Sequence, residues 1–299
     1  MKPTTVLILG GTGMIGHALL RKLSLAPNLQ VYATARSLEG VADRFPEALR
    51  ARILAGVDAS NSDDITRALA SVQPDVVINC IGLIKQLPTA NDHLLAISLN
   101  ALLPHRVALA CRAAKARLIH ISTDCVFDGK KGNYTERDLP NAEDIYGRTK
   151  MLGEIDGAHS LTLRTSAIGH ELKTRLELVD WFLSQTGSVR GFAKAIYSGL
   201  PTVELARVIA DFVIPNPGLH GIYNVSSAPI AKYDLLRMIA ERYRKTINIE
   251  PFDGFVQDRS LDSALFRAKT GYAPPAWAEL IDAMHADYEA HQETYHGAV

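Results

Sequence analysis

Short apolar runs alternate with amphipathic stretches through the first 165 residues of the chain. Six runs have the length and the β-branched content of buried strands: 5–9, 30–35, 51–57, 75–80, 117–122 and 161–164. Three amphipathic stretches repeat apolar residues at helical spacing: 16–25, 63–72 and 94–114. A kink is expected in the third, at Pro104, because proline lacks the N–H that a helix interior uses. This alternation predicts an α/β fold with a doubly wound parallel sheet of the Rossmann type.

The second half of the chain is less regular. Four stretches there have helical character: 179–185, 203–213, 233–244 and 276–289. One further strand is expected at 221–225, after a Pro- and Gly-rich loop. The segment after residue 289 is polar, and we expect it to fray.

Composition narrows the class of protein. The 299 residues include 32 basic and 32 acidic ones, so no excess positive charge attracts nucleic acid, which we exclude as a partner. We find no leader and no apolar run approaching about 18 residues, which predicts a cytoplasmic protein without a membrane partner. Three separated cysteines and ten scattered histidines match no metal-ligand spacing, so no metal is expected.

Three glycines lie between the first strand and the first helix. In a G-x-x-G-x-x-G loop the first glycine permits a tight turn, and the second lets a pyrophosphate approach the backbone. The third lets helix and strand pack closely, while the helix N-terminus faces the phosphate charge. We therefore expect a dinucleotide to bind the loop residues Gly10, Thr12, Gly13, Met14, Ile15 and Gly16.

The ends of the second and third strands bear on which dinucleotide binds. An acidic residue after the second strand would favour NAD(H), but the chain has Arg36, which can pair with a 2′-phosphate and favours NADP(H). Asp58 follows the third strand, where it can either accept a hydrogen bond from the adenine or cap the next helix. We expect a dinucleotide-binding domain at 1–168, to which some later elements return, and a mainly substrate-binding part at 169–299.

Tyr146 and Lys150 are four residues apart, so a helix would place both side chains on one face. A free phenol has a pKa of about 10 and is a poor acid or base at neutral pH. A nearby ammonium would stabilise the phenolate and lower that pKa, and the same lysine could bind the nicotinamide ribose. Ser122 and Thr123 end the fifth strand at the carboxyl side of the sheet, where ligands bind.

With these motifs the chain resembles the extended short-chain dehydrogenase/reductase family, and within it the dTDP-4-dehydrorhamnose reductase group. The resemblance covers nearly the whole length and rests on GGTGMIG, STDCVFDG, YTERD, YGRTKMLGE and SGLPT. It implies that Tyr146 protonates a substrate oxygen as hydride arrives from NADPH, that Thr123 hydrogen-bonds that oxygen and that Lys150 tunes the phenol. It also implies cofactor contacts at Tyr146, Lys150, Cys80, Ile81, Gly82 and Ser122.

Two departures from the family pattern bear on the reaction. The resemblance implies that sugar-nucleotide dehydratases carry Thr-Asp-Glu after the fifth strand, whereas this chain has Cys125 in place of the glutamate. Elimination then lacks its base, which favours simple carbonyl reduction. Ala167 stands where the rhamnose-pathway reductases usually have tryptophan, so the sugar or its nucleotide can differ from theirs.

The resemblance implies NADPH-dependent reduction of the keto group of a nucleoside-diphospho-4-keto-6-deoxy sugar, in the synthesis of surface polysaccharide precursors. Substrate contacts are expected from Thr123, Asp124, Arg175 and Arg190, although each arginine could equally lie on a solvated surface. Two other activities stay open: a nucleotide-sugar epimerase with tightly bound NAD, and a non-catalytic NADP-binding regulatory subunit. A homodimer is compatible with each of them.

Overall fold

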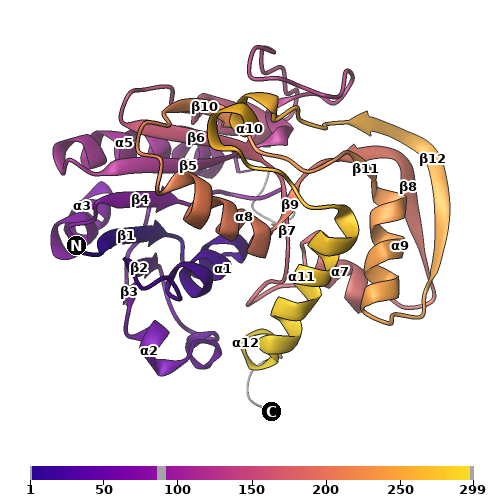
Figure 1. Cartoon of the computed structure of the whole chain (residues 1–299), viewed down its shortest axis with the longest axis horizontal. Coiled ribbons are helices and arrows are strands. Elements are labelled where there is room, and N and C mark those ends of the chain that lie inside the picture. Colours follow the sequence, from indigo (N-terminus) through magenta and orange to yellow (C-terminus); the bar gives the residue numbers. More distant parts are fainter. Residues whose placement is uncertain (1, 86–91, 297–299) are drawn as a thin grey trace.

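The largest sheet of the computed structural model, which describes residues 2–85 and 92–296, has seven strands (Figure 1). Its strand order is β10-β6-β5-β4-β1-β2-β3, and every neighbouring pair is parallel. The strands are β1 (Thr4–Leu9), β2 (Leu29–Ala35), β3 (Ile53–Ala55), β4 (Val76–Asn79), β5 (Arg117–Thr123), β6 (Ser160–Thr165) and β10 (Gly221–Asn224). The direction in which the chain adds strands to the sheet reverses between β1 and β4, as in a doubly wound nucleotide-binding sheet. This confirms the predicted fold class.

Helices cover both faces of this sheet. Val6 and Ile8 of β1 point to one face, where α1 (Met14–Leu23), α8 (Thr202–Val208) and α11 (Trp277–Ala290) pack. Leu7 and Leu9 point to the other, against α3 (Ser62–Val72) and α5 (Leu103–Ala113). Because both faces are buried, the strands read as continuous apolar runs instead of alternating ones.

The predicted long helix is three consecutive segments: α4 (His93–Ala96), a π-helix η3 (Ile97–Leu102) and α5. Pro104 lies at the start of α5, directly after the π-helical segment, so the irregularity falls where it was expected. Our expectation about apolar length was wrong here, because an 18-residue window within 93–113 has a mean hydropathy of 1.5, and the helix could span a membrane by length and composition alone. In the structure 39% of that window is buried as part of the layer on the sheet.

Irregular elements of the second half build a smaller unit. The sequence did not predict β8 (Ser188–Tyr197) and β12 (Asn248–Asp258), which pair in parallel, while β11 (Ile230–Ala231) joins β8 in antiparallel orientation. These strands and α9 (Lys232–Arg242) lie on one side of the molecule (Figure 1). Two further short strands, β7 (Ala167–Ile168) and β9 (Leu200–Pro201), pair with each other. The boundary at residue 168 remains a prediction; β10 and α8 pack with the first unit.

The expected fraying after residue 289 is wrong for residues 290–296. Residues 292–296 form α12 (Gln292–His296), and Thr294 is 5% exposed. The Tyr295 hydroxyl accepts a hydrogen bond from Arg21 Nη2 at 2.6 Å, and the same guanidinium pairs with Asp287. A buried cation from α1 therefore holds α12, which a polar sequence does not reveal.

Candidate active site

A cavity of about 200 Å³ lies at the carboxyl ends of β4, β5 and β6. Residues that follow these three strands line it, together with the start of α1 and part of the predicted Tyr-Lys helix. The lining comprises Met14, Ile15, Cys80, Ile81, Gly82, Leu83, Ile84, Lys85, Ile121, Ser122, Thr123, Cys125, Tyr146, Lys150, Thr165, Ser166, Ala167 and Glu177. Ligands bind at this end of a doubly wound sheet.

The glycine loop has the geometry that its spacing predicts. Gly10 adopts φ +87°, a left-handed conformation that L side chains rarely tolerate. A Cβ on Gly16 would lie 2.0 Å from the Gly10 carbonyl oxygen, so only glycine allows this contact between loop and helix. The helix α1 begins at Met14, earlier than expected, and Gly13 is its N-cap. Thr12 and Gly13 are partly or fully exposed, so the free N–H groups of the first turn suit a pyrophosphate.

Arg36 and Asp58 lie at the exposed ends of β2 and β3. Hydrogen bonds from Ser60 hold the pKa of Asp58 below its usual value, and the nearby Arg36 charge adds to the effect. Asn61, not Asp58, caps α3 by accepting a hydrogen bond from the amide of Asp63. The alternative in which Asp58 caps the next helix is therefore wrong, because Asn61 is the N-cap of that helix.

Tyr146 and Lys150 lie in α6 (Ile145–Leu152), and both line the cavity. Asp144 caps this helix by accepting a hydrogen bond from the amide of Gly147 at 2.8 Å. Burial raises the pKa of Tyr146 well above its usual value, against the lowering that the sequence led us to expect from Lys150, and a hydrogen-bonding interaction with Thr123 opposes the rise. Burial lowers the pKa of Lys150 to about 8, and its Nζ donates to the carbonyl oxygen of Ile121 at 2.8 Å.

The two hydroxyls that end β5 have different partners, because successive strand residues point to opposite faces. Ser122 Oγ donates to Glu154 Oε1 at 2.8 Å. Thr123 Oγ1 instead lies beside Tyr146 and donates to Asp124 Oδ1 at 3.1 Å. Thr123, and not Ser122, therefore has its hydroxyl next to the phenol.

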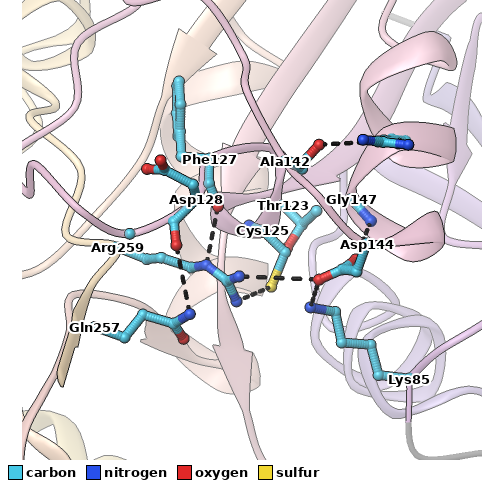
Figure 2. A network of polar contacts seen from close by, with 12 residues as sticks. Lys85, Thr123, Cys125, Phe127, Asp128, Ala142, Asp144, Gly147, Gln257 and Arg259 are labelled. Carbon is cyan, nitrogen blue, oxygen red and sulfur yellow. Dashed lines mark hydrogen bonds and ion pairs between the residues drawn. The ribbon is translucent and has the colours of Figure 1, made fainter. Parts of the chain in front are cut away.

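Figure 2 shows a polar network that includes three residues of the cavity lining: Lys85, Thr123 and Cys125. Lys85 Nζ pairs with Asp144 Oδ2 at 2.6 Å and lies 5.3 Å from the centre of the Tyr146 ring. Arg259 donates to the Phe127 carbonyl oxygen at 3.0 Å and to Cys125 Sγ at 3.3 Å (Figure 2). Burial raises the pKa of the Cys125 thiol to about 11, against the two nearby cations, so the thiol is neutral at physiological pH.

Sequence reasoning missed three charged residues of this region: Lys85, Glu177 and Arg259. Lys85 follows Gly82 in the loop after β4, and its place at the carboxyl end of a central strand could have indicated it. Burial and the neighbouring Glu171 raise the pKa of Glu177 to about 7. Arg259 comes from a segment 134 residues after Cys125, so no local pattern links the two.

Three of the four expected substrate contacts do not line the cavity. Asp124 is 6% exposed and lies behind Thr123. Arg175 is exposed and lines a separate hollow beside Arg44 and Asp180. Arg190 is exposed on β8 with its guanidinium 5.0 Å from the centre of the Phe252 ring. Only Thr123 of that set is in the cavity wall.

A comparison with protein families assigns the chain. The profile of the RmlD substrate binding domain matches residues 4–289. The chain belongs to this family. Its resemblance to extended short-chain reductases is thereby confirmed at the level of the family.

Other RmlD-type proteins are similar over most of the chain. A probable dTDP-4,6-dihydroxy-2-methyloxan-3-one 4-ketoreductase of Streptomyces antibioticus is 31% identical, over 78% of this chain and 75% of its own. Methionine adenosyltransferase 2 subunit beta of Danio rerio is 30% identical, over 80% and 73%. The dTDP-4-dehydrorhamnose reductase of Bacillus anthracis, solved with NADP, has a TM-score of 0.77 at 22% identity, covering 96% of this chain and 100% of that one. Structures of this fold carry NADP or NAD.

In this RmlD-type chain, Gly147 sets how closely α6 approaches the cavity wall. A Cβ there would lie 2.2 Å from the Cys125 carbonyl oxygen and 2.4 Å from the Ala142 Cβ. We expect Gly147→Ala to displace α6 and lower kcat by roughly 10²-fold, because misplacement by about 1 Å can have that effect. Steady-state kinetics would measure it. Gly157→Ala is the control, since a Cβ there meets nothing within 4 Å, and an equal loss in both variants would contradict the prediction.

Proposed function

We propose that this chain is an NADPH-dependent reductase of the keto group of a nucleoside-diphospho-4-keto-6-deoxy sugar. The proposal depends mainly on one observation: Tyr146, Thr123 and Lys150 line the same cavity as the first residues of α1. The similarity to the probable ketoreductase of Streptomyces antibioticus, which is named for a dTDP-linked sugar, supports this class of substrate. When bound, the nicotinamide would supply the hydride. The proposal includes a cytoplasmic role in the synthesis of surface polysaccharide precursors.

Each residue of the cavity has a distinct task in this proposal. The Tyr146 phenol is a donor whose pKa is kept high by burial, so it carries its proton until oxygen charge develops on the substrate. Lys150 is anchored by the Ile121 carbonyl with its charge inside the cavity wall, where it stabilises the phenolate that remains after proton transfer. Thr123 orients the substrate oxygen beside the phenol.

Cys125 supports reduction over water elimination. An elimination needs a base at the position that the dehydratase pattern gives to glutamate. The thiol of Cys125 keeps its proton because burial raises its pKa to about 11. Its Sγ already accepts a hydrogen bond from Arg259 at 3.3 Å.

The direct test is to mix the protein with NADPH and a panel of dTDP- and UDP-linked 4-keto-6-deoxy sugars. We expect the absorbance of NADPH to fall with at least one member, and one alcohol to form for each NADPH consumed. A nucleotide-sugar epimerase, the alternative from the sequence, would convert a sugar without net NADPH consumption and would retain NAD through purification.

Arg36 is expected to select the cofactor. Arg36→Ala removes the guanidinium at the end of β2, and a charged hydrogen bond contributes about 1.5–3 kcal/mol, so the KM for NADPH should rise roughly 10- to 100-fold. The KM for NADH should change little, because NADH has no 2′-phosphate. Arg112→Ala, an exposed arginine on α5, serves as the control. Equal changes for the two cofactors would contradict NADP selection by Arg36.

A non-catalytic role is the second candidate. The observation that favours it is the similarity to methionine adenosyltransferase 2 subunit beta, a protein named as a subunit of another enzyme. This role predicts tight NADP binding without turnover of any sugar in the panel. The expected homodimer also remains a prediction, which sedimentation at several protein concentrations would test.

A further inference from the structure

The Thr123 hydroxyl has three polar neighbours, and it can form hydrogen bonds with them in more than one arrangement. It accepts a hydrogen bond from the Cys125 amide at 3.1 Å, and its other two polar neighbours are Asp124 and Tyr146. A hydroxyl has one proton to donate and two lone pairs to accept with. The Cys125 amide can only donate, so it occupies one lone pair. One proton and one lone pair remain for the carboxyl and the phenol.

The ionisation of Asp124 decides whether the remaining proton and lone pair of Thr123 go to the carboxyl or to the phenol. A carboxylate can only accept, so it draws the Thr123 proton to itself at the observed 3.1 Å contact. The remaining lone pair then accepts from Tyr146, and neither hydroxyl proton points at a substrate. A neutral carboxyl can donate to that lone pair instead. The Thr123 proton is then free for a substrate oxygen, and Tyr146 keeps its proton for transfer.

The surroundings of Asp124 contain influences that favour its neutral form and influences that favour its charged form. It is 6% exposed, and burial raises its pKa above the usual value. The Arg259 guanidinium opposes this most strongly, followed by hydrogen bonds from Thr123 and Cys125 and by the Lys232 ammonium at the start of α9. Tyr146 from α6, Tyr197 from β8 and Cys125 are the neutral titratable groups that face it.

Arg259 is fixed in this position independently of Asp124. Its Nε donates to the Phe127 carbonyl oxygen and its Nη1 to Cys125 Sγ (Figure 2). The cation therefore stays beside the carboxyl whether or not Asp124 is charged. Asp124 itself lies behind Thr123 and outside the lining of the cavity, so it can act on a substrate only through its neighbour.

We propose that Asp124 is a positioning residue whose neutral form turns the Thr123 hydroxyl toward the substrate oxygen and leaves the Tyr146 proton available. The proposal rests on the reductase function proposed above. It replaces the direct substrate contact that the sequence suggested for Asp124. It also explains why Thr123 is hydrogen-bonded to a buried carboxyl. A threonine that acted only as a hydrogen-bond donor would not need that partner.

The first test is the pH dependence of kcat. In the wild type we expect kcat to fall by about tenfold for each pH unit above the pKa of Asp124, in addition to the fall caused by deprotonation of Lys150 near pH 8. Asp124→Asn can always donate, so it should lose this limb and keep only the change due to Lys150. Thr123→Ser keeps the hydroxyl and should retain the limb, as should Asp211→Asn, which removes an exposed carboxyl. A limb that persists in Asp124→Asn would overturn the proposal.

The second test needs no turnover. Infrared difference spectra across the same pH range should show, besides the signal of Glu177, a buried neutral carboxyl that is absent in Asp124→Asn and shifted in Thr123→Val. If this signal titrates but no sugar nucleotide is reduced, the proposed function fails while the coupling of Asp124 to Thr123 stands. If Asp124 gives no neutral signal at any pH at which the protein is folded, or if Thr123→Val leaves the signal in place, the coupling itself is wrong.

Discussion

Replacing Tyr146 with phenylalanine is expected to lower kcat by about 10²- to 10⁴-fold, the usual range for a positioned general acid. The substitution removes only the phenolic oxygen, which lies in the cavity beside Thr123. The ring would keep its contact with Lys85, so the fold and cofactor binding should change little. Steady-state kinetics with NADPH and a reducible sugar nucleotide would measure the loss, and fluorescence titration would measure NADPH binding.

The control for this variant is Tyr32→Phe. Tyr32 lies on β2 and is not in the lining of the cavity, and its hydroxyl accepts a hydrogen bond from Gln30. Its removal should leave kcat within about twofold, since no proton transfer depends on it. Near-wild-type turnover by Tyr146→Phe would mean that another group protonates the substrate, and the proposed mechanism would be wrong.

The Glu154→Gln variant is expected to lower the free energy of unfolding by about 3–5 kcal/mol, the usual result of breaking a buried ion pair. Glu154 accepts from Arg164 Nε at 2.8 Å and from Arg164 Nη2 at 2.7 Å, and the two side chains are 5% and 4% exposed. Glutamine keeps the shape but leaves the guanidinium without a counter-charge in the interior. Urea unfolding followed by circular dichroism would measure the difference.

The matched control is Glu143→Gln, which removes a carboxylate that is 72% exposed and pairs with Lys130 at 2.7 Å. Water and salt screen such a pair, so the urea midpoint should not move measurably. Equal midpoints for the two variants would contradict the prediction for Glu154.

The same variant should also act on the cavity. The Glu154 carboxylate opposes the burial that lowers the pKa of Lys150 to about 8. Without that negative charge, the pKa of Lys150 should fall further, so the ammonium should lose its proton at a lower pH. The part of the alkaline fall in kcat that is due to Lys150 should therefore move to lower pH in Glu154→Gln, a shift that a loss of stability alone would not produce.

The first half of the fold could be predicted because its signals are local. Most of the six strands of this part are apolar runs buried on both faces of the sheet, and the Gly10 and Gly16 conformations follow from contacts within a short loop. The second half gave weaker signals. The strand β12 is mostly exposed along its length, so it lacks the apolar pattern that would have indicated it.

The sequence by itself determined the sheet, the glycine loop and the face shared by Tyr146 and Lys150, since each depends on residues within a few positions of one another. Only the tertiary structure decided that Thr123 and not Ser122 lies beside the phenol, and that Asp124 is buried behind it. It also brought Lys85 and Arg259 to the carboxylate of Asp144, and Arg259 to the thiol of Cys125 (Figure 2). These contacts join segments up to 134 residues apart, and their charges are shifted by burial, which exists only once the chain has packed.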